Sequence, residues 1–165
     1  TAAAATSGST GLSGTYAAGP LLVSVAMSKT ESTVATVNAQ NDGSAITATY
    51  DFGAAKLFAG YIRGKTQADT SISTFTESTE TNLGVSVPFG AATLMAAYGR
   101  NTSDVTTAGV ATGQTGSDIV VGVTYDLSKR TALYFKTGRV NSLDNTTALA
   151  GTKTSITSLG MRHLF

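Results

Sequence analysis

The sequence contains neither cysteine nor tryptophan, and only 13% of its 165 residues are charged, whereas soluble domains average about a quarter. The lack of cysteine excludes disulfide frameworks, thiol catalysis and zinc-thiolate sites. The charges nearly cancel, to a formal net +1, so we expect no nucleic-acid partner. The longest apolar stretch, residues 21–27, is interrupted by Ser24 and falls short of the roughly 18 to 20 apolar residues of a transmembrane helix.

What the sequence has instead is alternation of apolar with small or polar residues. Apolar residues take every second position in segments 46–52, 83–89 and 119–127. A period of two places each apolar set on one face of a β-strand. These segments end at Phe52, Phe89 and Leu127, spaced by 37 and 38 residues, and a further 38 residues reaches Phe165. The spacing indicates an internal repeat of one hairpin plus one loop.

Returning strands are predicted between these marks, over residues 21–29, 56–65, 93–100 and 131–140. Stretches rich in Thr, Ser, Asn, Asp and Gly are predicted as long loops at 33–43, 67–79, 101–116 and 142–152. Counting back from Phe165 gives nine strands, the first over 12–18, each near the length of a tilted transmembrane strand. Short turns alternating with long loops are typical of outer-membrane barrels, whereas a soluble sandwich keeps most connections short.

Aromatic residues gather at two levels of the predicted strands. Near the short turns lie Tyr16, Tyr50, Phe52, Phe89, Tyr125 and Phe165, and toward the long loops lie Tyr61 and Tyr98. A membrane interface selects two such rings around an aliphatic band, so we interpret these residues as membrane-interface aromatics. The alternative is a soluble barrel whose ends the aromatics plug. It is disfavoured because the alternate face of Thr, Ser, Gly and Asp suits a wet lumen better than a packed core. The predicted fold is an all-β, antiparallel, up-and-down transmembrane barrel.

Parity against the apolar sets assigns one group of charged residues to the inward face, where they are predicted to line a pore: Lys56, Lys136, Arg162, Asp51, Asp118 and Asp126. Three positive and three negative charges give this wall no net field. Arg63, Arg100 and Arg139 lie near the predicted long loops, and parity decides their facing less clearly. Contact with lipid headgroups, or snorkelling, is an equally good interpretation for them.

Catalytic interpretations lack partners in this sequence. The only histidine, His163, shares a face with Met161 and Phe165, which favours a structural role. Glu77 and Glu80 fall in a predicted loop, and without rigid elements to fix the separation of paired carboxylates they are interpreted as solubility residues. No acidic set is spaced for calcium, and the glycines follow no phosphate-cradling pattern. We therefore predict no enzymatic activity, no metal and no cofactor.

Three segments resemble the general porins of Gram-negative bacteria. The tail 158–165, Ser-Leu-Gly-Met-Arg-His-Leu-Phe, is similar to the closing strand of that family. Segment 125–134, Tyr-Asp-Leu-Ser-Lys-Arg-Thr-Ala-Leu-Tyr, resembles the turn before the penultimate strand in the beta-proteobacterial branch, and segment 50–57 resembles an earlier turn. The resemblance covers nearly the whole chain. One departure is Leu164, at a position where the family often has a basic residue, and it would weaken recognition by the assembly machinery.

The resemblance implies a sixteen-stranded barrel of the bacterial outer membrane, usually a homotrimer, that admits small hydrophilic solutes and ions by passive diffusion and leans toward anions. Single-chain bacterial barrels have even strand counts, so nine strands predict the C-terminal part of one barrel domain over residues 1–165, without the N-terminal half and its constriction loop. The implied partners are outer-membrane lipid, the solutes and ions, and the machinery that reads the C-terminal strand. A structural or adhesive barrel without an open pore and a soluble β-sandwich binding module are the alternatives.

Overall fold

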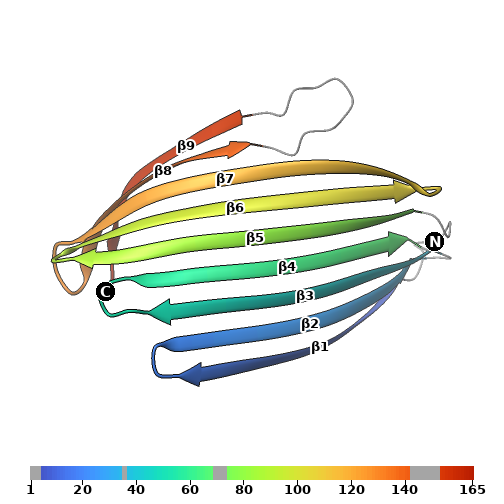
Figure 1. The fold of residues 1–165 in the computed structure, drawn as a ribbon, viewed down its shortest axis with the longest axis horizontal. Helices are drawn as coiled ribbons and strands as arrows, with labels where there is room; N and C mark the ends of the chain where they lie inside the picture. The colour runs from blue at the N-terminus through green and yellow to red at the C-terminus, as the bar shows by residue number, and fades with distance from the viewer. Residues whose placement is uncertain (1–4, 35–36, 69–73, 142–152) are drawn as a thin grey trace.

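The computed structural model describes residues 5–34, 37–68, 74–141 and 153–165, and it places them in one antiparallel sheet (Figure 1). Nine strands cross the sheet in the order of the chain. They are β1 Ala5–Ala18, β2 Leu21–Val34, β3 Val37–Asp51, β4 Lys56–Ala68, β5 Thr74–Phe89, β6 Ala92–Thr107, β7 Val110–Asp126, β8 Thr131–Asn141 and β9 Lys153–His163. The antiparallel, up-and-down arrangement of nine strands predicted from the alternation is confirmed.

Glycines allow the tight connections at one end of the sheet. Gly19, Gly53 and Gly90 take φ values of 52°, 81° and 60° in the β1–β2, β3–β4 and β5–β6 connections. Residues with a side chain rarely adopt this left-handed conformation. In the β3–β4 turn the Asp51 carboxylate also accepts a hydrogen bond of 2.8 Å from the Gly53 amide. These connections come where the repeat in the sequence places its short turns.

The opposite ends of the strands differ from the sequence prediction. Residues 33–43, predicted as a loop, belong to β2 and β3 apart from 35–36, and residues 101–116 belong to β6 and β7 apart from a tight turn at Ala108 and Gly109. Of the predicted loop 67–79, residues 67–68 lie in β4 and 74–79 in β5, while loop 142–152 lies outside the described residues. β1 also begins seven residues before the predicted 12–18. The prediction of long loops is therefore wrong wherever these residues are described, because strand pairing continues through sequence that is rich in hydroxyl residues on both faces.

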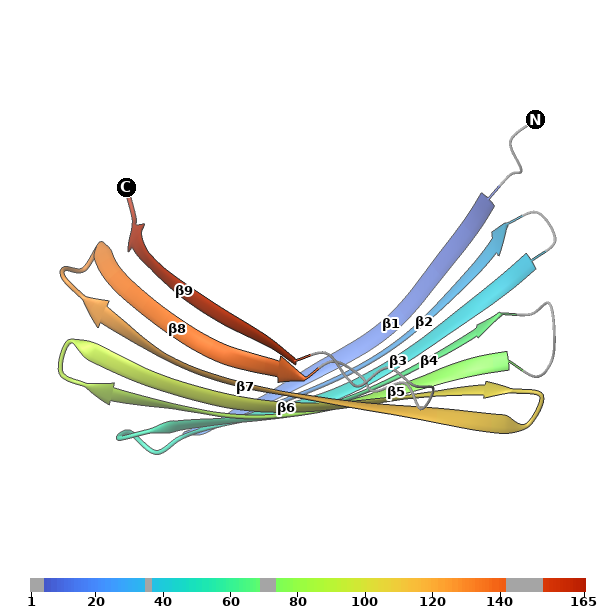
Figure 2. The same cartoon turned by 90° about the horizontal axis from the view of Figure 1, so that it is seen from above.

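The sheet curves into an open trough when it is seen from above (Figure 2). By register, the strand glycines on one face are Gly11, Gly43, Gly60, Gly64, Gly84, Gly99, Gly116, Gly122, Gly138 and Gly160, while the other face has Gly8, Gly14 and Gly113. A Cβ atom added at Gly99 would collide with Asp118, and one at Gly138 would collide with Val120. Side chains converge on the concave side of a curved sheet, so we infer that the glycine-rich face is the concave one.

Within the part of the chain that the structure describes, no second layer covers either face of the sheet. Among the apolar residues of the described ranges only Ala132 is buried, while Leu83 and Tyr98 keep 58% and 47% of their surface exposed. A soluble β-sandwich packs two sheets around a shared core, and the described strands form one sheet. The soluble sandwich therefore does not fit this structure. The described residues also include no helix with the length and apolar character needed to span a membrane.

Candidate functional site

The register divides the side chains of the sheet between two faces. Successive residues of a strand point to opposite sides, and directly paired residues point to the same side. The aliphatic face contains Leu83 and its pairing partners Ala59 and Tyr98, and the polar face contains Asn82 and its partner Gly99. The unbroken pairing from β1 to β9 extends this division to every strand.

The aromatic residues predicted at the membrane interface share the aliphatic face or its parity: Tyr16, Tyr50, Phe52, Phe89, Tyr125, Phe165, Tyr61 and Tyr98. At the short-turn end the rings of Tyr50 and Phe52 lie with their centroids 4.4 Å apart. Tyr61 and Tyr98 lie near mid-strand instead of near the strand ends, because seven and nine strand residues follow them. The strands therefore continue well past the apolar band.

The charged residues predicted to line a pore all lie on the polar face: Lys56, Lys136, Arg162, Asp51, Asp118 and Asp126. Lys56 and Asp51 are paired in register, and Nζ of the lysine lies 3.2 Å from Oδ2 of the aspartate. The other four belong to β7, β8 and β9, and no salt bridge joins any of them within the described ranges. The register thus brings all six to one surface without gathering them into one cluster.

Sequence reasoning missed two features of the polar face. Glu80 lies in β5 on this face, not in a loop, and its Oε1 accepts a hydrogen bond of 2.9 Å from Nδ2 of Asn82. The second feature is an apolar patch that includes Phe58, Met95 and Val120, all about two-fifths exposed. Its signal was present in the sequence, because each of these residues breaks the alternation by adding an apolar side chain at a polar-face position.

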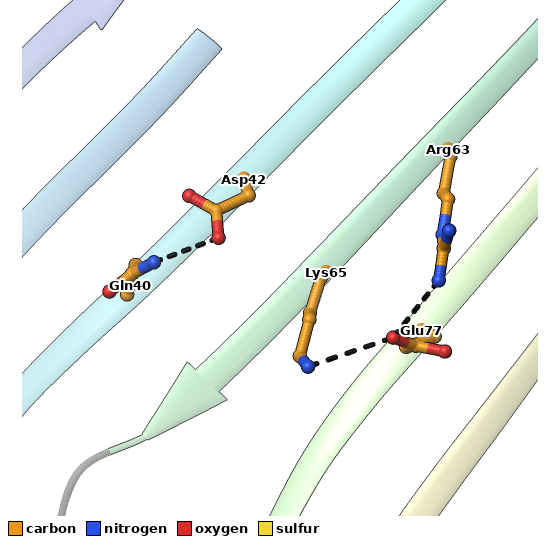
Figure 3. A network of polar contacts seen from close by, with 5 residues as sticks. All are labelled: Gln40, Asp42, Arg63, Lys65 and Glu77. Carbon is orange, nitrogen blue, oxygen red and sulfur yellow. Dashed lines mark hydrogen bonds and ion pairs between the residues drawn. The ribbon is translucent and has the colours of Figure 1, made fainter.

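Charged residues also extend the aliphatic face beyond the level of Tyr61 and Tyr98. Arg63 and Lys65 of β4 both reach Oε1 of Glu77 in β5, at 3.3 Å from Nη2 and 3.7 Å from Nζ (Figure 3). The loop assignment of Glu77 was wrong for the same reason as that of Glu80. Register places Arg100 and Arg139 on this face as well. A polar belt therefore follows directly after the apolar band on the same side of the sheet.

The single histidine makes only local contacts. Nδ1 of His163 lies 2.9 Å from Oγ1 of Thr131, and its ring meets that of Phe165 edge-on at 4.9 Å between centroids. In the described part of the chain no three His, Cys, Asp or Glu residues come together as a metal site. These contacts give His163 a place at the aromatic level of the aliphatic face.

A continuous antiparallel meander, apolar on one face and polar on the other, is the construction of a transmembrane barrel wall. A family model described as Gram-negative porin matches residues 1–145. The chain belongs to the Gram-negative porin family. This porin is accordingly a multi-pass protein of the outer membrane, and the family predicted from segments 125–134 and 158–165 is confirmed. The match includes the first of these two segments.

Solved structures show how much of a barrel this porin represents. An anion-selective porin from Comamonas acidovorans is similar with a TM-score of 0.77 and 24% identity, over 95% of this chain and 49% of that chain. OmpT of Vibrio cholerae in its trimer form and the outer-membrane-expressed OmpT are similar with TM-scores of 0.76 and 14% identity, over 95% of this chain and 56% of theirs. The likeness concerns the fold, and the chain spans about half the length of these proteins. Comparison with curated proteins gave no match.

Proposed function

We propose that the chain forms part of the wall of a water-filled channel through which small hydrophilic solutes and ions cross the outer membrane by passive diffusion. The observation that carries this proposal is the separation of the two faces: apolar and aromatic side chains on one, glycines, hydroxyls and charges on the other. Hydrocarbon requires an apolar surface, and a water-filled lumen accepts polar side chains. The proposal involves no catalytic step.

In this channel, the six polar-face charges Lys56, Lys136, Arg162, Asp51, Asp118 and Asp126 line the pore, and the eight aromatic residues at the aliphatic face mark the membrane interfaces. Fixed charges at the lumen decide which ions pass. With Glu80, the described strands bring four acids and three bases to the polar face. A preference for anions like that of the anion-selective Comamonas porin must therefore come mainly from charges outside these nine strands.

The proposed channel closes with strands beyond the nine that the described residues form. We propose that residues 1–165 are a continuous part of one barrel domain, completed to sixteen strands, and that the complete barrel assembles as a homotrimer after the outer-membrane machinery has read its C-terminal strand. Support comes from the coverage of about half of the similar outer-membrane proteins. Open edge strands in lipid would leave backbone groups unsatisfied, so closure of the ring is a physical requirement.

Conductance tests this function directly. The complete porin is inserted into a planar bilayer in KCl, and stable current steps are expected in groups of three for a trimer. A reversal potential under a KCl gradient then reports the ion preference, expected on the chloride side. A barrel that inserts but shows no current would instead be the structural or adhesive barrel.

A further inference from the structure

The apolar patch on the polar face lies within an ordered set of rows. Register places Lys56, Met95 and Lys136 in one row across the sheet, and Phe58 and Val120 in the next row away from the short turns. Rows on one face are about 7 Å apart along a strand. Between these side chains the same rows contain Gly84 and Gly122, which leave the backbone open.

Hollows in the concave side coincide with this patch. One of about 610 Å³ is lined by Phe58, Met95, Val120 and Lys136, and a second of about 330 Å³ is lined by Met95, Tyr134, Lys136 and Arg162. Met95 and Lys136 belong to both, so the two hollows adjoin. Ligand sites are typically concave, mainly apolar and supplied with a few placed polar groups, and these hollows fit that description.

The charges at the patch are asymmetric. Lys136 and Arg162 lie toward the short-turn end, and neither forms a salt bridge with a carboxylate among the residues that are described. Lys56, in the same row as Lys136, is by contrast paired with Asp51. Asp118 lies one row beyond Val120, farther from the short turns. Arg162 shares its row with Asp126, with Ala132 between them, so Lys136 is the positive charge nearest the patch and faces Asp118 across it.

We propose that this part of the wall is a binding site for an amphipathic carboxylate, a solute with an aromatic or alkyl body and one anionic end. The apolar body lies over Phe58, Met95 and Val120, and the carboxylate binds Lys136 with Arg162 beyond it. Repulsion from Asp118 fixes this orientation. The inference rests on the proposed channel, and it names the class of solute that the channel retains longest on its way through.

The experiment compares two acids that differ only in a ring. The complete porin conducts KCl in a planar bilayer, and 4-phenylbutyrate or butyrate is titrated while the reduction of the current is recorded. Binding of the ring buries apolar surface against the patch. We therefore expect 4-phenylbutyrate to reduce the current at about tenfold lower concentration than butyrate. Phenylethylammonium, which has a ring and the opposite charge, is expected to act no better than butyrate.

Variants then locate the site. In the double variant Met95→Ser with Val120→Ser, the half-blocking concentration of 4-phenylbutyrate should rise to nearly that of butyrate. Lys136→Gln should raise the half-blocking concentration of both acids. Lys65→Gln, which removes a lysine from the aliphatic face, is the matched control and should change neither. KCl conductance of each variant verifies that its barrel has formed.

The outcomes separate this inference from the channel itself. A complete porin that conducts KCl but responds equally to 4-phenylbutyrate and butyrate would overturn the carboxylate site and leave the channel standing, and this comparison needs no variant. A preference that survives the serine double variant would also overturn it, since the ring would then bind elsewhere, for example on a constriction loop. Absence of any KCl current would overturn the channel.

Discussion

Adjacent alanines on β6 provide a sharp test of which face meets lipid. Ala96 lies on the aliphatic face between Leu94 and Tyr98, and Ala97 lies on the polar face. Each is replaced by lysine in the complete porin. Because the parent residue, the strand and the new side chain are the same, differences in β-propensity cancel. The comparison then isolates the surroundings of the new ammonium group.

The expected difference follows from the cost of a charge in hydrocarbon. A lysine near the middle of the lipid-facing band of a barrel costs about 2 to 4 kcal/mol, so we expect Ala96→Lys to lower the free energy of unfolding by about 3 kcal/mol. Ala97→Lys places its ammonium group in water and should cost less than about 1 kcal/mol. A gap of about 2 kcal/mol corresponds to roughly thirtyfold in the folding equilibrium.

The assay is equilibrium unfolding of the porin in lipid vesicles with guanidinium, followed by the heat-dependent shift in gel mobility of the folded barrel. Unfolding and refolding titrations must coincide before a free energy is taken. Two lysine variants that agree within about 0.5 kcal/mol, or a larger loss for Ala97→Lys, would refute the assignment of the faces and with it the channel wall.

Three further predictions use the same unfolding assay. Gly138→Ala should lower the free energy of unfolding by about 1 to 3 kcal/mol, because the new Cβ collides with β7. Gly8→Ala, with no atom within 4 Å of the new Cβ, should change it by less than about 0.5 kcal/mol. Equal effects would contradict the crowding of the concave face. Ala108→Asn should raise the free energy of unfolding by about 0.5 to 1 kcal/mol, because Ala108 has a φ of 50° before a turn glycine and asparagine tolerates that conformation better than alanine. A lower free energy of unfolding would argue against that turn. A double-mutant cycle with Asp51→Asn and Lys56→Gln should give a coupling energy below about 1 kcal/mol that falls with added salt, because both side chains are over two-fifths exposed. A larger coupling energy that does not respond to salt would indicate a buried pair.

Alternation predicted the strands because a membrane wall presents two different solvents to its two faces. Segments 83–89 and 119–127 keep that contrast, and both lie inside strands of the structure. Beyond the membrane both faces meet water, so the pattern disappears although the pairing continues. This is why residues 101–107 and 110–116, rich in Thr, Ser and Gly, had the sequence character of a loop yet belong to β6 and β7.

The facing of residues in the candidate wall was predictable for the same reason, as far as the alternation extends. Parity placed Lys136 and Arg162 on the polar face of the register, because each lies an odd number of residues from an apolar residue of the other face, such as Phe135 or Met161. It did not indicate that Asp51 and Lys56 would pair, which depends on the register of β3 with β4. Nor could it bring Met95 beside Lys136, since these residues come from strands separated by β7.

In the proposed channel, the ten strand glycines of the concave face leave bare backbone at their positions on the bore. Gly60 and Gly84 could each accept a Cβ with only ordinary contacts, 3.5 Å or more from neighbouring atoms. The width and chemistry of the passage can therefore be retuned one methyl group at a time while the lipid-facing surface keeps its composition. In a wall of this design, residues of the polar face determine what passes, and residues of the aliphatic face determine that the protein resides in the membrane. Each set can change without disturbing the other.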